Sequence, residues 1–73
     1  MVYEIQFVRF AEGETWPAIL QKMEIESPIL SRVEEQAHLI YRATAVANPA
    51  NGWQVIENGG AVVSQWQDPD RQG

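Results

Sequence analysis

The residues that could carry acid–base chemistry in this chain are few and scattered. His38 is the only histidine among 73 residues, so one chain cannot supply a site with two histidine ligands. At helical spacing His38 lies one turn from Glu34 and one turn from Arg42, where a general base or a solvated surface residue would fit. The polar surroundings favour the solvated residue, and an enzyme built around His38 and Glu34 at a dimer interface is the weakest hypothesis.

No stronger nucleophile is present. The chain has no cysteine, which excludes thiolate nucleophiles, thiolate metal sites and disulfides. Ser27 is placed to cap a helix, Ser31 lies on the polar side of that helix, and Ser64 lies in a predicted strand. None of them sits in the sharp strand-to-helix turn that exposes a hydrolase serine. We expect no enzymatic activity.

Three pairs of acidic residues are spaced by two positions: Glu12 and Glu14, Glu24 and Glu26, and Asp68 and Asp70. An extended segment would place both carboxylates of a pair on one side, where a hard cation could bind. No pair is followed by the further oxygen ligands that a calcium loop requires, and the glycines form no phosphate-binding pattern. The pattern favours solvated charge, with no metal and no cofactor.

The charge and length of the chain exclude other classes of function. The net charge is −5, and no two basic residues are adjacent, whereas a phosphate backbone requires several on one face. Nucleic acid is therefore not an expected partner. The N-terminal residues form neither a signal peptide nor a membrane span, so we expect a cytoplasmic protein. We expect a single domain over residues 1–67 and a flexible polar tail over residues 68–73.

His38 belongs to the one segment that is long and periodic enough to predict a helix, from Ser27 to Val46. Ser27 is a favourable N-cap and Pro28 suits the first helical position, while Pro49 ends the helix before Asn48. Leu39 and Val46 lie on the flank, where they are incidental or touch a second subunit. An apolar stripe predicts packing on a sheet; its residues are Ile29, Leu30, Val33, Ala37, Ile40, Tyr41, Ala43, Thr44 and Ala47.

Two segments precede this helix. Residues 2–10 alternate as a strand, with Tyr3, Ile5 and Phe7 on the face that we expect under the helix. Residues 15–23 favour a short helix capped by Thr15, and an extended arm that ends at Glu26 is the alternative.

A β-hairpin is predicted after the helix, from Trp53 to Trp66. Asn58-Gly59 favours a two-residue type I′ turn, while a turn at Gly59-Gly60 would place Trp53 directly opposite Trp66. Both registers place Trp53, Val55, Val62 and Trp66 on one side of the hairpin. Both also place Ile56, Ala61 and Val63 on the other side.

These elements predict an α+β fold: a small three-stranded antiparallel or mixed sheet, formed by a strand and a hairpin, with helix packed on one face. The first strand would be antiparallel beside the second hairpin strand. Beside the first hairpin strand it would require a right-handed parallel crossover. The sequence leaves both arrangements open.

The aromatic residues suggest the function, because a small domain uses them either as core or as a contact surface. If Ile56, Ala61 and Val63 meet the helix, the opposite face carries the candidate partner-binding residues Trp53, Val55, Val62, Trp66, Val8 and Phe10. This arrangement predicts a small non-enzymatic interaction or accessory protein that forms a homodimer through the sheet face or a sheet edge, or binds another protein. The alternative is a small-ligand binder with an aromatic pocket between Trp16, Trp53 and Trp66.

Overall fold

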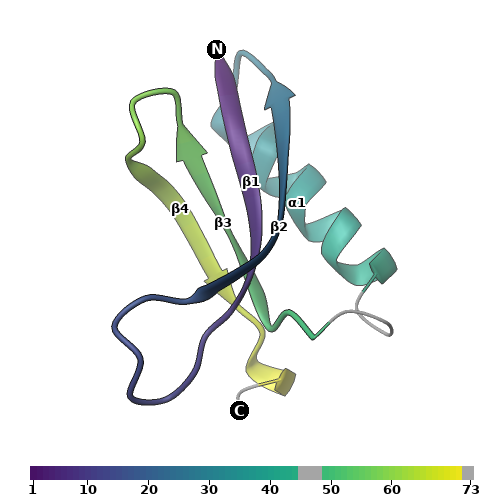
Figure 1. The fold of residues 1–73 in the computed structure, drawn as a ribbon. Coiled ribbons are helices and arrows are strands. Elements are labelled where there is room, and N and C mark those ends of the chain that lie inside the picture. Colours follow the sequence, from purple (N-terminus) through teal and green to yellow (C-terminus); the bar gives the residue numbers. More distant parts are fainter. Residues whose placement is uncertain (45–48, 72–73) are drawn as a thin grey trace.

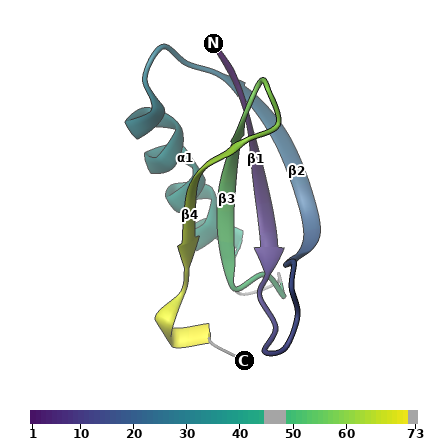
Figure 2. The same ribbon diagram turned by 90° about the vertical axis from the view of Figure 1, so that its left-hand side faces the viewer.

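The fold is an α+β arrangement in which one helix packs on an antiparallel sheet (Figures 1 and 2). The computed structural model describes residues 1–44 and 49–71. The sheet order is β2-β1-β3-β4, and each neighbouring pair is antiparallel. The elements along the chain are β1 (Val2–Arg9), β2 (Ala18–Glu26), α1 (Leu30–Thr44), β3 (Gly52–Glu57), β4 (Val62–Gln67) and the 3-10 helix η1 (Pro69–Arg71).

The sheet has four strands and not the three expected. The prediction of a short helix over residues 15–23 is wrong, and the additional strand includes most of that segment. Residues 18–26 form β2, which is the extended alternative. From Lys22 to Glu26 the exposed charged side chains alternate with the half-buried apolar side chains of Met23 and Ile25, and this period of two belongs to a strand. β1 therefore lies between β2 and β3 and is antiparallel to both. Both arrangements expected for the first strand are therefore wrong: β1 lies beside the first hairpin strand, β3, but is antiparallel to it.

The core lies between α1 and the face of the sheet that the odd residues of β1 form. Tyr3, Ile5 and Phe7 are buried there, as the alternation of the first strand predicted. α1 contributes Val33, Ala37 and Tyr41, which recur every four residues and so lie on one side of a helix. Trp53 and Val55 of β3 complete the layer beneath α1.

The N-terminus of α1 has the expected cap, because the Ser27 hydroxyl accepts a hydrogen bond from the Ile29 amide at 3.3 Å. The buried stripe is rotated from the predicted one. Ile29 and Ala43 are exposed, whereas Glu34 and His38, expected on the solvated side, are half-buried. The reason is that β4 extends the sheet beneath that flank of the helix. The predicted helix residues Val46 and Ala47 lie outside the described part of the chain.

The β3–β4 turn differs from the predicted type I′ turn. The amide of Glu57 donates to the carbonyl of Ala61 at 3.0 Å, and the amide of Gly60 donates to the carbonyl of Glu57 at 2.8 Å. Asn58, Gly59 and Gly60 therefore form a three-residue loop. Gly60 has a φ of 89°, while no described non-glycine residue has a positive φ, so Asn58 cannot take the type I′ conformation. Trp53 pairs with Trp66, as the alternative turn predicted.

A register shift between Val55 and Ile56 overturns the predicted hairpin faces. Val55 pairs with Ser64, but Ile56 pairs with Val62, so β4 has one extra residue between the two pairs. Such a bulge reverses the face on which the following residues lie. Val62 consequently shares a face with Ile56, away from α1, and does not lie with Trp53 and Val55.

The chain closes at a corner formed around Asn51, just before β3. The Asn51 side chain is fully buried and makes two hydrogen bonds with the backbone of Phe10: its Oδ1 accepts from the amide at 2.6 Å and its Nδ2 donates to the carbonyl at 2.8 Å. The carbonyl of Asn51 also accepts a hydrogen bond from the amide of Asp68 at 2.7 Å. The predicted tail thus starts at a residue attached to this corner, and residues 72–73 lie outside the described part.

Candidate functional site

The aromatic residues of the hairpin pack under the helix. The ring of Trp66 lies 6.1 Å from that of Trp53 in a stacked arrangement, with 25° between the planes. Tyr41 and His38 of α1 meet Trp66 edge-on, at 5.2 Å and 4.8 Å. Trp53 is only 5% exposed, and its Nε1 has no hydrogen-bond partner within the described part of the chain. These four rings join β3 and β4 to α1.

The structure divides the six residues predicted to bind a partner. Trp53, Val55 and Val8 are buried within a single chain, Trp66 and Phe10 are half-buried, and Val62 is exposed. A partner reaches only exposed atoms, so an aromatic face formed by all six does not exist in one chain. Sequence reasoning grouped them because the bulge in β4 was not foreseen.

The sheet face away from α1 is polar at its centre. Gln65 donates through Nε2 to Oε1 of Gln54 at 3.0 Å, and Gln54 donates in the same way to Gln6 at 2.6 Å. Gln6 in turn donates to the carboxylate of Glu4. This row of amides crosses β4, β3 and β1, and each amide donates one hydrogen bond to the next group in the row. The centre of the open face is therefore polar, whereas the predicted dimer through the sheet face assumed an apolar surface there.

The groups considered for catalysis have structural partners. Arg42 donates through Nε to Nε2 of His38 at 3.0 Å, and Glu34 accepts a hydrogen bond from the hydroxyl of Ser64. His38 also packs against the ring of Trp66. The Glu34–Ser64 bond attaches the first half of α1 to β4, so both residues help to position the helix.

A pocket of about 310 Å³ opens where α1 approaches the end of β4, and Tyr41, Arg42, Trp66, Asp68, Pro69 and Asp70 line it. Of the three tryptophans in the predicted ligand pocket, only Trp66 lines this one. Trp53 is buried behind it, and Trp16 is 80% exposed on the β1–β2 connection. The hydroxyl of Tyr41 donates to the carboxylate of Asp68 at 2.8 Å across the pocket wall.

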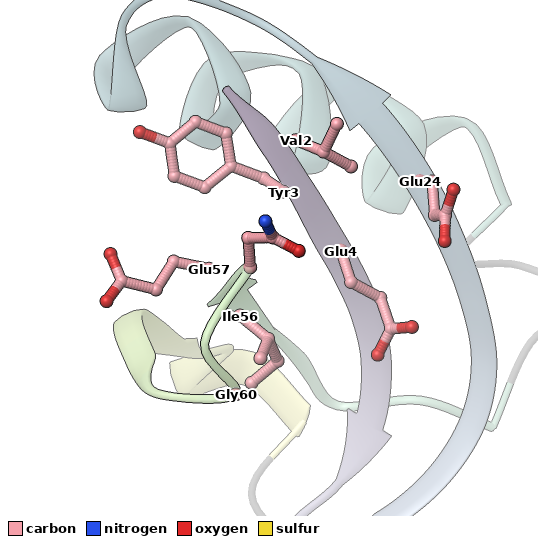
Figure 3. Close-up of a pocket in the computed structure, with 8 residues that line it drawn as sticks. Val2, Tyr3, Glu4, Glu24, Ile56, Glu57 and Gly60 are labelled. Atoms are coloured by element: carbon pink, nitrogen blue, oxygen red, sulfur yellow. The ribbon is translucent and has the colours of Figure 1, made fainter.

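A second pocket, of about 270 Å³, lies at the other end of the sheet, between β1, β2 and the β3–β4 turn (Figure 3). Glu4, Glu24 and Glu57 contribute carboxylates to its lining. The described residues contain no group of three or more histidine, aspartate or glutamate side chains that could hold a metal ion. Glu4 and Glu24 lie directly opposite one another on β1 and β2. Like charges in this position repel and destabilise the pair of strands.

β2 is an edge strand, so one side of its main chain has no neighbouring strand in the described sheet. The amide of Ser27 donates to the carbonyl of Met1 at 3.0 Å, which fixes the hydrogen-bonding phase of the β1–β2 pair. Because bonded and non-bonded pairs alternate in an antiparallel ladder, Gln21, Met23 and Ile25 bond to β1. The amides and carbonyls of Lys22, Glu24 and Glu26 consequently face away from the sheet. The side chains of Lys22 and Glu24 also form no hydrogen bond or ion pair with any described residue.

Large apolar side chains are exposed at both ends of this edge. Trp16, Ile19 and Leu20 lie around the start of β2. Ile29 follows its end, and Met1 and Val2 lie beside that end because Val2 pairs with Glu26. These are six of the eight exposed large apolar residues in the described part of the chain; the other two are Leu39 and Val62. Because exposed apolar side chains gather at both of its ends, the edge of β2 is a candidate contact surface.

Sequence reasoning missed this edge, because it favoured a helix for the segment that forms β2. The signal that could have revealed it is the strict alternation of Gln21, Met23 and Ile25 with Lys22, Glu24 and Glu26. Charged residues at alternate positions are typical of an edge strand with one face towards a core.

Comparison with known proteins adds no relative: no family model, no curated protein and no solved structure matches this chain. Among the described residues, no helix has the length and apolar character needed to cross a membrane.

Proposed function

We propose that this chain is a small non-enzymatic interaction protein that forms a homodimer by joining the β2 edges of two copies. The observation that carries the proposal is the outer edge of β2, where unpaired main-chain groups lie between two exposed apolar ends. Addition of a strand to such an edge is a common mode of protein association, in which main-chain hydrogen bonds supply affinity and side chains supply specificity.

A second copy is the partner that fits this edge best. When two identical strands pair antiparallel, the start of each lies beside the end of the other. Trp16, Ile19 and Leu20 of one chain would then approach Ile29 of the other, and the same contact would occur twice. Both apolar ends become covered by one symmetric interface.

The edge is favoured over the sheet face by the side chains that each offers. The open face has its amide row at the centre, with Gln6 and Gln54 already hydrogen-bonded to each other. At the other edge of the sheet, Val62 alone is exposed among the large apolar side chains of β4. The edge of β2, with exposed apolar side chains at both ends, therefore gives the larger apolar interface.

The test uses a proline that blocks the outer edge of β2 without breaking its inner ladder. The amide of Glu24 faces away from β1, so Glu24→Pro removes only a bond to the second copy. Glu24→Gln is the matched control, because it removes the charge but keeps the amide. Solution mass is measured by light scattering over a dilution series, and circular dichroism verifies that each variant is folded.

We expect the wild-type chain and Glu24→Gln to reach twice the 8.3 kDa mass of one chain on concentration, with Glu24→Gln dimerising at higher concentration. Folded Glu24→Pro should remain at the mass of a single chain. A wild-type chain that stays monomeric throughout contradicts the proposal, as does a folded Glu24→Pro variant that dimerises as well as Glu24→Gln.

A further inference from the structure

We infer that the two β2 strands meet in one register, with Lys22 of each chain opposite Glu24 of the other and the two Met23 residues facing each other on the twofold axis. The inference rests on the proposed homodimer and specifies its interface. It is carried by the hydrogen-bonding phase of β2 and by the order of charges along it.

The main chain restricts the possible registers. Only Lys22, Glu24 and Glu26 turn their amides and carbonyls outwards along the regular part of β2, so hydrogen-bonded pairs between copies must form among these residues. Beyond Gln21 the β1–β2 register shifts, because Phe7 pairs with Gln21 while Val8 pairs with Ile19. This bulge twists the start of β2 and confines regular pairing to the second half of the strand.

The charges select among the remaining registers. An axis at Lys22 would place the two Lys22 residues opposite one another, and an axis at Glu24 would place the two Glu24 residues opposite one another. An axis at Ile25 would place Glu24 of each chain opposite Glu26 of the other. Like charges directly opposite are unfavourable in a sheet, whereas opposite charges are favourable. An axis at Met23 places Lys22 opposite Glu24 on both sides of the axis and brings no like charges into direct opposition. Each of these two pairs also exchanges both of its main-chain hydrogen bonds.

The same register relieves the repulsion within each chain. Glu24 lies between Glu4, its neighbour on β1, and the open edge (Figure 3). Lys22 of the second copy would occupy the open side of Glu24 and place a positive charge on the same face of the sheet. The unpaired lysine and the repelled glutamate of one chain thus complement those of the other.

The side chains on the helix side fit this register as well. Met23 and Ile25 are half-buried at the margin of the core beneath α1. With the axis at Met23, the two methionines face each other, and Ile25 of each chain lies opposite Gln21 of the other. Half-exposed apolar area next to the core of each chain would then be covered. The two helices would lie on the same side of one continuous eight-stranded sheet.

Disulfide cross-linking of single-cysteine variants tests the register directly. The natural chain contains no cysteine, so any cross-link must form between the introduced residues. The variants are Lys22→Cys, Met23→Cys and Glu24→Cys, each oxidised while dimeric and analysed by non-reducing electrophoresis. A residue on the twofold axis faces its own copy at the short separation that a disulfide requires, whereas residues two positions apart across the sheet are too distant. We expect Met23→Cys to cross-link to itself at least about tenfold faster than the other two.

Each other outcome has a separate meaning. Faster cross-linking of Lys22→Cys or Glu24→Cys overturns the register but retains the edge dimer. A dimeric mass with no cross-linking at any of the three positions overturns the register. Monomeric chains show that the proposed dimer itself fails, which the light-scattering series detects independently.

Charge reversal provides a second test that does not depend on disulfide geometry. In this register position 22 of each chain lies opposite position 24 of the other. A dimer of Lys22→Glu therefore has two glutamates in each of these pairs, and a dimer of Glu24→Lys has two lysines in each. We expect each variant alone to dimerise at least about tenfold more weakly than wild type. An equimolar mixture of the two should recover heterodimers, because every pair then joins opposite charges. A mixture that associates no better than the separate variants overturns the register.

Discussion

At the scale of single residues, Gly52 is the position where the fold tolerates no side chain. It begins β3 opposite Gln67 and lies beneath the ring of Phe10. A Cβ atom there would come within 2.8 Å of Cε2 of Phe10 and closer still to the carbonyl oxygen of Trp66. The Phe10 ring can move, but the Trp66 carbonyl belongs to the backbone of β4.

We therefore expect Gly52→Ala to lower the free energy of unfolding by about 3 kcal/mol, the upper part of the range for overpacked interiors. Urea denaturation followed by tryptophan fluorescence measures the change. Gly59→Ala is the control, because a Cβ at Gly59 meets nothing within 4 Å and its φ is not positive. Equal stability of the two variants would show that β4 moves aside at no cost.

The sequence gives no sign of the roles of Gly52 and its neighbour Asn51. Both belong to a segment whose composition is that of a loop, and composition does not distinguish a solvated asparagine from a buried one. Asn51 is buried because its amide replaces a strand partner for the backbone of Phe10, 41 residues earlier in the chain. A contact over such a separation depends on the complete topology, so local patterns cannot reveal it.

At the scale of elements, regular spacing of apolar residues predicted most helices and strands correctly, whereas the irregular features of the sheet were not predicted. The first strand, the main helix and the hairpin were all expected from apolar spacing, and the face of β1 beneath the helix was correct. β2 was missed because Trp16, Pro17, Ile19, Leu20 and Met23 also fit a helix, and pairing with β1 decides the outcome. The bulge in β4 leaves no signal in the sequence and reverses the side on which Val62 lies.

The hairpin turn gives a prediction at this scale. Gly60 takes a φ of 89°, whereas nothing lies within 4 Å of a Cβ built on it, so the cost of a substitution arises from the backbone alone. Gly60→Ala should lower the free energy of unfolding by about 1–2 kcal/mol, the penalty of an L-residue in the left-handed region.

Gly60→Asn provides the comparison for this turn, because asparagine tolerates the left-handed region better than alanine. We expect it to recover about half of the lost stability, measured by thermal unfolding followed by circular dichroism. Equal losses in both variants would indicate that the turn changes to another type when Gly60 is replaced.

At the scale of the whole molecule, the sequence predicted an α+β fold with helix packed on one face of a sheet, and the structure has that arrangement with one helix, α1. The number and order of the strands could not be predicted from the sequence, since the order β2-β1-β3-β4 follows from pairings between distant segments. The candidate surface changed for the same reason. Trp53 and Val55, predicted as contact residues, fill the core, while the exposed apolar side chains gather beside β2.

A chain of 73 residues has a small core, and association is one way for such a chain to gain stability. If the β2 edges join, unfolding must also separate the copies, so the free energy of unfolding depends on protein concentration. Because free monomer rises with the square root of total concentration, each tenfold increase above the dissociation constant should add about 0.7 kcal/mol per chain.

Urea denaturation at several concentrations of the wild-type chain measures this dependence, with Glu24→Pro as the control that keeps the fold and blocks the edge. The unfolding midpoint should rise with concentration for wild type and stay constant for Glu24→Pro. A constant midpoint for both would mean that one chain reaches its full stability alone. In that case the apolar side chains beside β2 contribute nothing to the fold, and the dimer they would form is too weak to matter for stability.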